Sequence, residues 1–83
     1  MKEVKVYSTS YCPFCMKAKQ LLKSKNIPFQ EIDLTNDSAT REKLSKETGW
    51  QTVPMIFIDG KLIGGFDDLN SLNQKGQLEA LLA

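Results

Sequence analysis

The only two cysteines of the chain, Cys12 and Cys15, are separated by two residues in the segment CPFC. Such a pair serves in zinc sites, in structural disulfides and in thiol–disulfide exchange. A zinc site needs a second pair of ligands, but the chain has no third cysteine and no histidine. A disulfide that closes so short a loop constrains the unfolded chain little. We therefore expect a redox pair and no bound metal.

Length and composition indicate one small globular domain over residues 1–83. The chain has 83 residues, 41% of them hydrophobic, and a formal net charge of +1. This charge favours no nucleic-acid partner, and we interpret the cluster of Lys17, Lys19, Lys23 and Lys25 as a solvated helix face. The first ten residues lack the apolar core of a signal peptide, and the apolar run 53–58 is too short to span a bilayer. We expect a cytoplasmic protein without membrane contact, where thiols are kept reduced.

The residues around the cysteines predict a strand followed at once by a helix. Residues 3–8 alternate between polar and apolar, which is typical of a strand. One apolar stripe then follows at helical spacing, formed by Phe14, Ala18, Leu21 and Leu22. Pro13 fits the first turn of this helix because that turn does not need its missing N–H.

This placement assigns different roles to the two cysteines. Cys12 lies at the predicted helix N-terminus, where unpaired backbone N–H groups favour a thiolate, so we expect it to be the nucleophile. Cys15 follows about one turn later on the same side and can attack a disulfide formed at Cys12. We expect the resolving thiol, Cys15, to be more buried and to have the higher pKa.

The rest of the chain continues the alternation of strands and helices. We expect strands over 29–34, 55–58 and 61–64, with a turn at Asp59-Gly60 between the last two. We expect helices from Asp37 or Ser38 to Thr48, from a cap at Asp67 or Asp68 to Asn73, and in a short turn with Leu78, Leu81 and Leu82. The order βαβ, α, ββ hairpin, α predicts an α/β fold with a four-stranded mixed sheet and helices on both faces.

Three motifs together resemble the dithiol glutaredoxins, in particular their small bacterial type: Cys12-Pro13-Phe14-Cys15, Thr52-Val53-Pro54 and Gly64-Gly65-Phe66-Asp67-Asp68. The resemblance covers the whole chain as a single glutaredoxin domain. It implies a thioredoxin fold and an enzyme of cell redox homeostasis, a glutathione-dependent thiol–disulfide oxidoreductase with a redox-active disulfide. It further implies electron transport from glutathione to glutathione mixed disulfides and some protein disulfides, with glutathione as co-substrate, no other cofactor, and a monomeric state.

The resemblance also implies a glutathione site, whose candidate residues are Phe14, Arg41, Thr52, Val53, Pro54, Gly65, Phe66, Asp67 and Asp68. Backbone N–H groups at Gly64-Gly65 suit the γ-glutamyl carboxylate, and Asp67 or Asp68 suits the ammonium, although either aspartate can instead simply cap a helix. By similarity Pro54 is a cis proline that frees the Val53 backbone to pair with the substrate; the alternative is a proline that merely begins a strand. Arg41 falls where the family contacts the glycine carboxylate.

The sequence departs from the family pattern at two positions. Thr9 stands three residues before the nucleophile, where glutaredoxins often have lysine, and Phe14 stands where tyrosine is common. One expected cation is therefore missing. Trp50, just before Thr52-Val53-Pro54, is interpreted most simply as a packing residue, or else as a wall of the substrate cleft.

Other functions remain open at this point. A thioredoxin-like reductant could be reduced by a flavoprotein reductase instead of glutathione. A dimer could hold an iron–sulfur cluster with Cys12 of each chain and two glutathiones, although Pro13 argues against it because cluster-binding members tend to have glycine there. A structural or interaction protein would leave the cysteine pair unexplained.

Overall fold

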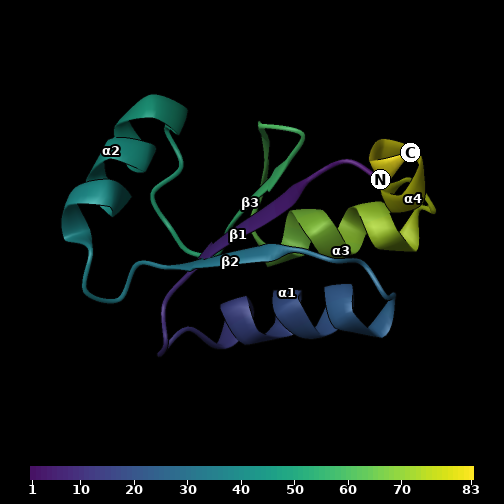
Figure 1. Ribbon diagram of the computed structural model, residues 1–83, viewed down its shortest axis with the longest axis horizontal. Coiled ribbons are helices and arrows are strands. Elements are labelled where there is room, and N and C mark those ends of the chain that lie inside the picture. Colours follow the sequence, from purple (N-terminus) through teal and green to yellow (C-terminus); the bar gives the residue numbers. More distant parts are fainter.

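The computed structural model describes residues 1–83 and contains four strands and four helices (Figure 1). In chain order these are β1 (Val4–Ser8), α1 (Pro13–Ser24), β2 (Gln30–Asp33), α2 (Ser38–Thr48), β3 (Met55–Ile58), β4 (Lys61–Gly64), α3 (Phe66–Gln74) and α4 (Leu78–Leu82). The predicted order of elements is confirmed, and α3 extends one residue beyond its expected end. None of the helices is long and apolar enough to cross a membrane.

The four strands form one mixed sheet in the order β2-β1-β3-β4. Strand β1 is parallel to β2 and antiparallel to β3, and β3 is antiparallel to β4. Strand β2 lies at an edge, which explains its weak alternation of polar and apolar residues. Asp59 and Gly60 both have positive φ, 54° and 77°, as a two-residue hairpin turn of this type requires.

Helices α1 and α3 pack on one face of the sheet and enclose the core, while α2 stands apart from them (Figure 1). The core includes Val4, Val6, Ala18, Leu22, Ile56, Ile58 and Leu69. On the opposite face the rings of Tyr7 and Phe57 meet edge to face, with their centres 5.4 Å apart. Tyr7, Phe57 and Leu44 of α2 line one small hollow on this face. No residue of α2 is buried, so this helix covers its face of the sheet only thinly.

The helix ends follow the expected capping residues at α2 but not at α3. The Asp37 carboxylate accepts the Thr40 N–H at 3.1 Å, and Gly49 ends α2 with a φ of 75°. At α3 the N-cap position is Gly65 and not Asp67 or Asp68, so the helix begins earlier than predicted, although Asp68 still takes part in the cap. Asp68 lies inside the first turn and reaches back, and its carboxylate accepts the Gly65 N–H at 3.1 Å.

We predict that Leu22→Ala destabilises the fold by about 2–5 kcal/mol, because Leu22 is fully buried between α1 and the sheet and its truncation leaves a cavity. Denaturant unfolding measures this loss. Leu81→Ala is the matched control, since Leu81 is 38% exposed, and it should change the free energy of unfolding by no more than about 0.5 kcal/mol. Equal losses in the two variants would contradict the assignment of the core.

Candidate active site

The sulfur of Cys12 occupies the N-cap position of α1. Cys12 has an extended backbone, and its Sγ accepts the backbone N–H of Cys15 at 3.2 Å. Pro13 is the first residue of the helix, as the sequence predicted. Cys12 is 8% exposed, so its sulfur lies just beneath the surface. A backbone N–H directed at a sulfur at the positive end of a helix suits a thiolate nucleophile.

Cys15 lies one turn further into the helix and is fully buried. Burial is the main reason that the pKa of Cys15 is raised to about 12, and its hydrogen bond with Cys12 adds to the effect. Both thiols are free. The expected difference in burial between the two cysteines, and the raised pKa of Cys15, are therefore confirmed. No group of three or more histidine, cysteine or carboxylate side chains is placed to hold a metal ion.

The segment before β3 brings a second part of the backbone to Cys12. The Val53–Pro54 peptide bond is cis, as the resemblance implied. The Cys12 S–H donates to the Val53 carbonyl at 3.5 Å, although the two residues are 41 positions apart in the sequence. Antiparallel pairing of Tyr7 in β1 with Met55 in β3 brings the end of one strand next to the start of the other. The sheet therefore sets the distance between Cys12 and this segment.

A groove of about 350 Å³ adjoins Val53 and is lined by Phe14, Trp50, Thr52, Val53, Pro54, Gly65, Phe66, Asp67 and Asp68. All of the predicted glutathione residues except Arg41 line it. The rings of Phe14 and Phe66 lie 6.4 Å apart and form its apolar part. Asp67 and Asp68 give its α3 side a negative charge. The groove thus offers apolar walls, backbone polar groups and carboxylates to one ligand.

At the start of α3 the backbone is packed closely against Asp68. Gly64 has a φ of 128°, and a Cβ at this position would overlap the Asp68 carboxylate. The Gly65 N–H is already bonded to that carboxylate, so it is not free for a ligand, contrary to expectation. The next N–H groups, of Phe66 and Asp67, belong to the first helical turn and have no partner within the helix. Together with the Asp68 N–H of the same turn, these are the backbone donors that α3 can offer to an anion.

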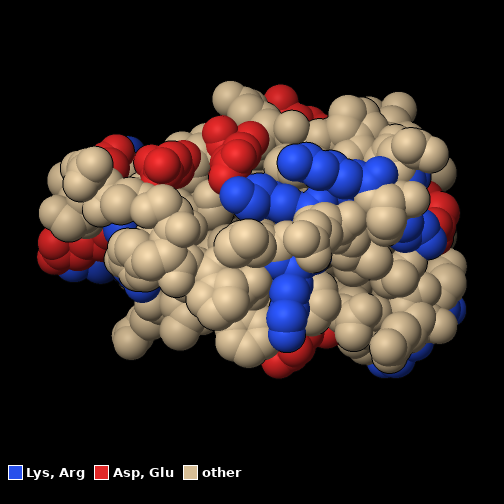
Figure 2. All heavy atoms as spheres, turned by 90° about the horizontal axis from the view of Figure 1, so that it is seen from below, with Lys and Arg blue, Asp and Glu red and all other residues tan.

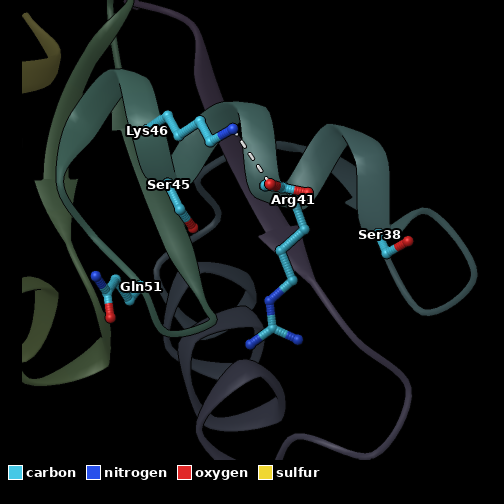
Figure 3. Close-up of a pocket in the computed structure, with 6 residues that line it drawn as sticks. Ser38, Arg41, Ser45, Lys46 and Gln51 are labelled. Carbon is cyan, nitrogen blue, oxygen red and sulfur yellow. Dashed lines mark ion pairs between the residues drawn. The ribbon is translucent and has the colours of Figure 1, made fainter.

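Arg41 lies outside this groove, in a polar hollow of about 420 Å³ on α2 (Figure 3). The hollow is lined by Ser38, Arg41, Glu42, Ser45, Lys46 and Gln51. Lys46 is paired with Glu42 at 3.2 Å, whereas the Arg41 guanidinium extends away from that pair (Figure 3). Gln51 borders this hollow, and its neighbours Trp50 and Thr52 line the groove, so the two hollows adjoin along one short segment.

Trp50 is a groove residue that the sequence did not place with certainty. Its ring lies against Gly65, where an added Cβ would come within 3.3 Å of Cζ2. Its indole Nε1 is buried without a hydrogen-bond partner. The sequence signal was its position just before Thr52-Val53-Pro54, which identified the segment but not the direction of the ring.

Thr9, at the position of the missing lysine, is 3% exposed, and its Oγ1 has no hydrogen-bond partner. Its carbonyl accepts the Cys12 N–H at 3.4 Å. Thr9 therefore supports the loop before α1 but supplies no charge to the site.

Comparison with known proteins agrees with this geometry. Residues 4–63 match the glutaredoxin family model. The chain is 46% identical over 82 residues to glutaredoxin 3 of Escherichia coli K12, and the match covers 99% of each chain. It is 43% identical over 83 residues to a glutaredoxin of Pseudomonas aeruginosa, covering 100% of this chain and 99% of the relative.

Solved structures give the same result. A buckwheat glutaredoxin–glutathione complex matches with a TM-score of 0.92 and 33% identity, covering 98% of this chain and 76% of the other. The holo form of glutaredoxin C1 from Populus tremula x tremuloides also has a TM-score of 0.92, with 36% identity and the same coverage. The chain therefore belongs to the glutaredoxin family, as a small dithiol member of the bacterial type with a thioredoxin fold, and is a glutathione-dependent thiol oxidoreductase.

Proposed function

We propose that this protein reduces glutathione mixed disulfides and some protein disulfides, with Cys12 as nucleophile and Cys15 as resolving thiol. The observation that carries the proposal is the position of the Cys12 sulfur, 3.2 Å from the Cys15 nitrogen and 3.5 Å from the Val53 oxygen. The Cys15 N–H supports a thiolate at Cys12, and Val53 lines a groove large enough for a small peptide. A cytoplasmic location and a monomeric state are part of this proposal.

The reduction of a mixed disulfide needs only Cys12. Its thiolate attacks the glutathione sulfur, the disulfide breaks, and the protein thiolate leaves and takes up a proton. Cys12 is then joined to glutathione. A second glutathione thiolate attacks the glutathione sulfur of this adduct, oxidised glutathione leaves, and the Cys12 thiolate is regenerated.

A protein disulfide needs Cys15 as well. Attack by Cys12 leaves the substrate bound through a mixed disulfide, which Cys15 breaks by attacking the Cys12 sulfur. The Cys12–Cys15 disulfide is then reduced by two glutathiones. Because the pKa of Cys15 is raised to about 12, Cys15 must lose its proton as it attacks. In the route through glutathione alone, Cys15 does not react and keeps its proton.

Glutathione would lie in the groove beside Val53. Its γ-glutamyl carboxylate suits the N–H groups of Phe66 and Asp67 at the start of α3, and its ammonium suits Asp67 or Asp68. The Val53 backbone can pair with its cysteine residue as a short added strand, and Arg41 can reach the glycine carboxylate from the adjoining hollow.

The proposed roles are tested by replacing each cysteine with serine. We expect Cys12→Ser to abolish reduction of a small glutathione mixed disulfide, and Cys15→Ser to retain most of it, because only Cys12 takes part in that cycle. The assay couples glutathione and glutathione reductase to turnover. If both variants were equally inactive, the single-thiol cycle would be wrong, and if the unaltered protein showed no turnover, the proposed function would fail.

The different environments of the two thiols predict selective alkylation. We expect iodoacetamide to label the native reduced protein once, at Cys12, between pH 7 and 9. Cys15 is buried and, with a pKa of about 12, stays protonated in this range. Mass spectrometry of peptides identifies the labelled residue, and the denatured protein should take two labels. Rapid labelling of native Cys15 at pH 8 would contradict the structure.

The role of Arg41 is tested against a neighbouring cation in the same hollow. We expect Arg41→Gln to raise the KM for glutathione about threefold to fivefold, the effect of one exposed charge–carboxylate contact, without lowering kcat. Lys46→Gln is the control. It should leave this KM unchanged, because Lys46 is already paired with Glu42. Equal effects of the two substitutions would indicate that only the net charge of the hollow matters.

A further inference from the structure

Three exposed apolar side chains lie close to the nucleophile in the sequence, in the turn before α1 and in its first turn. Tyr11, Phe14 and Met16 are 68%, 50% and 54% exposed, and the other exposed large hydrophobic residues, Met1 at 78% and Leu81 at 38%, lie near the chain ends. Single exposed hydrophobic residues are common, but three within six positions around a reactive sulfur are not explained by packing. Tyrosine and methionine are also enriched where proteins bind one another.

Lys17 adds an unpaired positive charge to these residues. Its Nζ lies 5.1 Å from the centre of the Phe14 ring, a cation–π distance. Two other lysines of the cluster differ: Lys19 is paired with Glu31 at 2.6 Å, and Lys25 is paired with Glu79, whereas Lys23 is exposed further along the helix. The cluster is therefore not a uniformly solvated face, and Lys17 is the cation held beside the groove.

The face that α1 covers carries mainly positive charge along its middle (Figure 2). Helix α1 contains no acidic residue. On the other side of the groove, α3 presents Asp67 and Asp68. The two sides of the site are thus opposite in charge, positive on α1 and negative on α3, so a charged partner would be recognised differently on each side.

The proposed reaction determines which side a protein substrate meets. In thiol–disulfide exchange the attacked sulfur lies between the attacking and the leaving sulfur. If glutathione fills the groove, the leaving protein cannot occupy it and must lie over its rim. There Phe14 borders the groove, and Tyr11 directly precedes Cys12.

We propose that Tyr11, Phe14, Met16 and Lys17, the α1 platform, bind the leaving protein and select substrates whose modified cysteine has apolar and acidic neighbours. This inference rests on the proposed function and adds the class of protein substrate. The apolar side chains of the platform match apolar neighbours of the cysteine, and Lys17 matches a carboxylate. Glutathione itself uses the groove, whose wall includes Phe14 of the platform, and does not need Tyr11, Met16 or Lys17.

The test compares two glutathionylated peptides that differ only in having glutamate or lysine next to the modified cysteine. At low salt we expect kcat/KM to be about threefold to tenfold higher for the glutamate peptide, and the difference to shrink as salt screens the charges. Lys17→Gln should remove the preference. Lys23→Gln, an exposed lysine further along the same helix that forms no ion pair, should preserve it.

A small glutathione mixed disulfide without a peptide separates this inference from the proposed function. Lys17→Gln should leave its turnover unchanged, since no protein reaches the platform. If the small disulfide and both peptides react but the peptides do so equally, the platform inference is overturned and the proposed function stands. If none of the three reacts, the proposed function itself has failed.

The apolar part of the platform is tested with Tyr11→Ser and Met16→Ser, which should fold normally because both side chains are more than half exposed. We expect each variant to raise the KM for a glutathionylated peptide with apolar neighbours about twofold to fivefold, and to leave the KM for the small disulfide unchanged. An equal rise for both substrates would place these side chains in the glutathione site and overturn the inference.

Discussion

The structure of the site depends on one hydrogen bond, from the Cys15 N–H to the Cys12 sulfur. A serine, threonine, aspartate or asparagine oxygen is the preferred acceptor for an N–H of the first helical turn, and here the reactive sulfur takes that role. The same bond orients the nucleophile and places Cys15 one turn inside, where burial keeps its proton in place. Because α1 is anchored on the sheet through Ala18 and Leu22, the position of the sulfur is set by the core.

The rest of the site comes from the ends of elements that share this core. Strands β1 and β3 are antiparallel neighbours in the sheet, so the loop that leads from β1 to Cys12 and the segment that ends at Pro54 meet at the same end of these two strands. The first turn of α3 completes the groove, with Asp68 held by the Gly65 N–H and filling the space that Gly64 leaves without a side chain. Sulfur, backbone donors and carboxylates are therefore arranged before any substrate arrives, which lowers the cost of binding.

Local signals in the sequence were sufficient for most of the fold. Asp37 and Gly49 marked the ends of α2, Asp59-Gly60 marked the hairpin, and the weak alternation of β2 fitted its place at an edge. The site was less predictable where side chains far apart in the sequence meet. The sequence could not show that Asp68 takes the Gly65 N–H, that the Trp50 ring lies on Gly65, or that a separate hollow holds Arg41, because each depends on tertiary packing.

Helix α2 differs from the other parts of the site in its stability. It has no buried residue; Ala39 is exposed and Leu44 only half-buried, so few apolar contacts oppose its local opening. Cys12, Pro54 and Asp68 lie in or next to α1, β3 and α3, which contribute residues to the core, whereas Arg41 lies on a helix that contributes none. A ligand held by Arg41 would bind only the closed helix, so by mass action the folding of α2 and the occupancy of its hollow are thermodynamically linked.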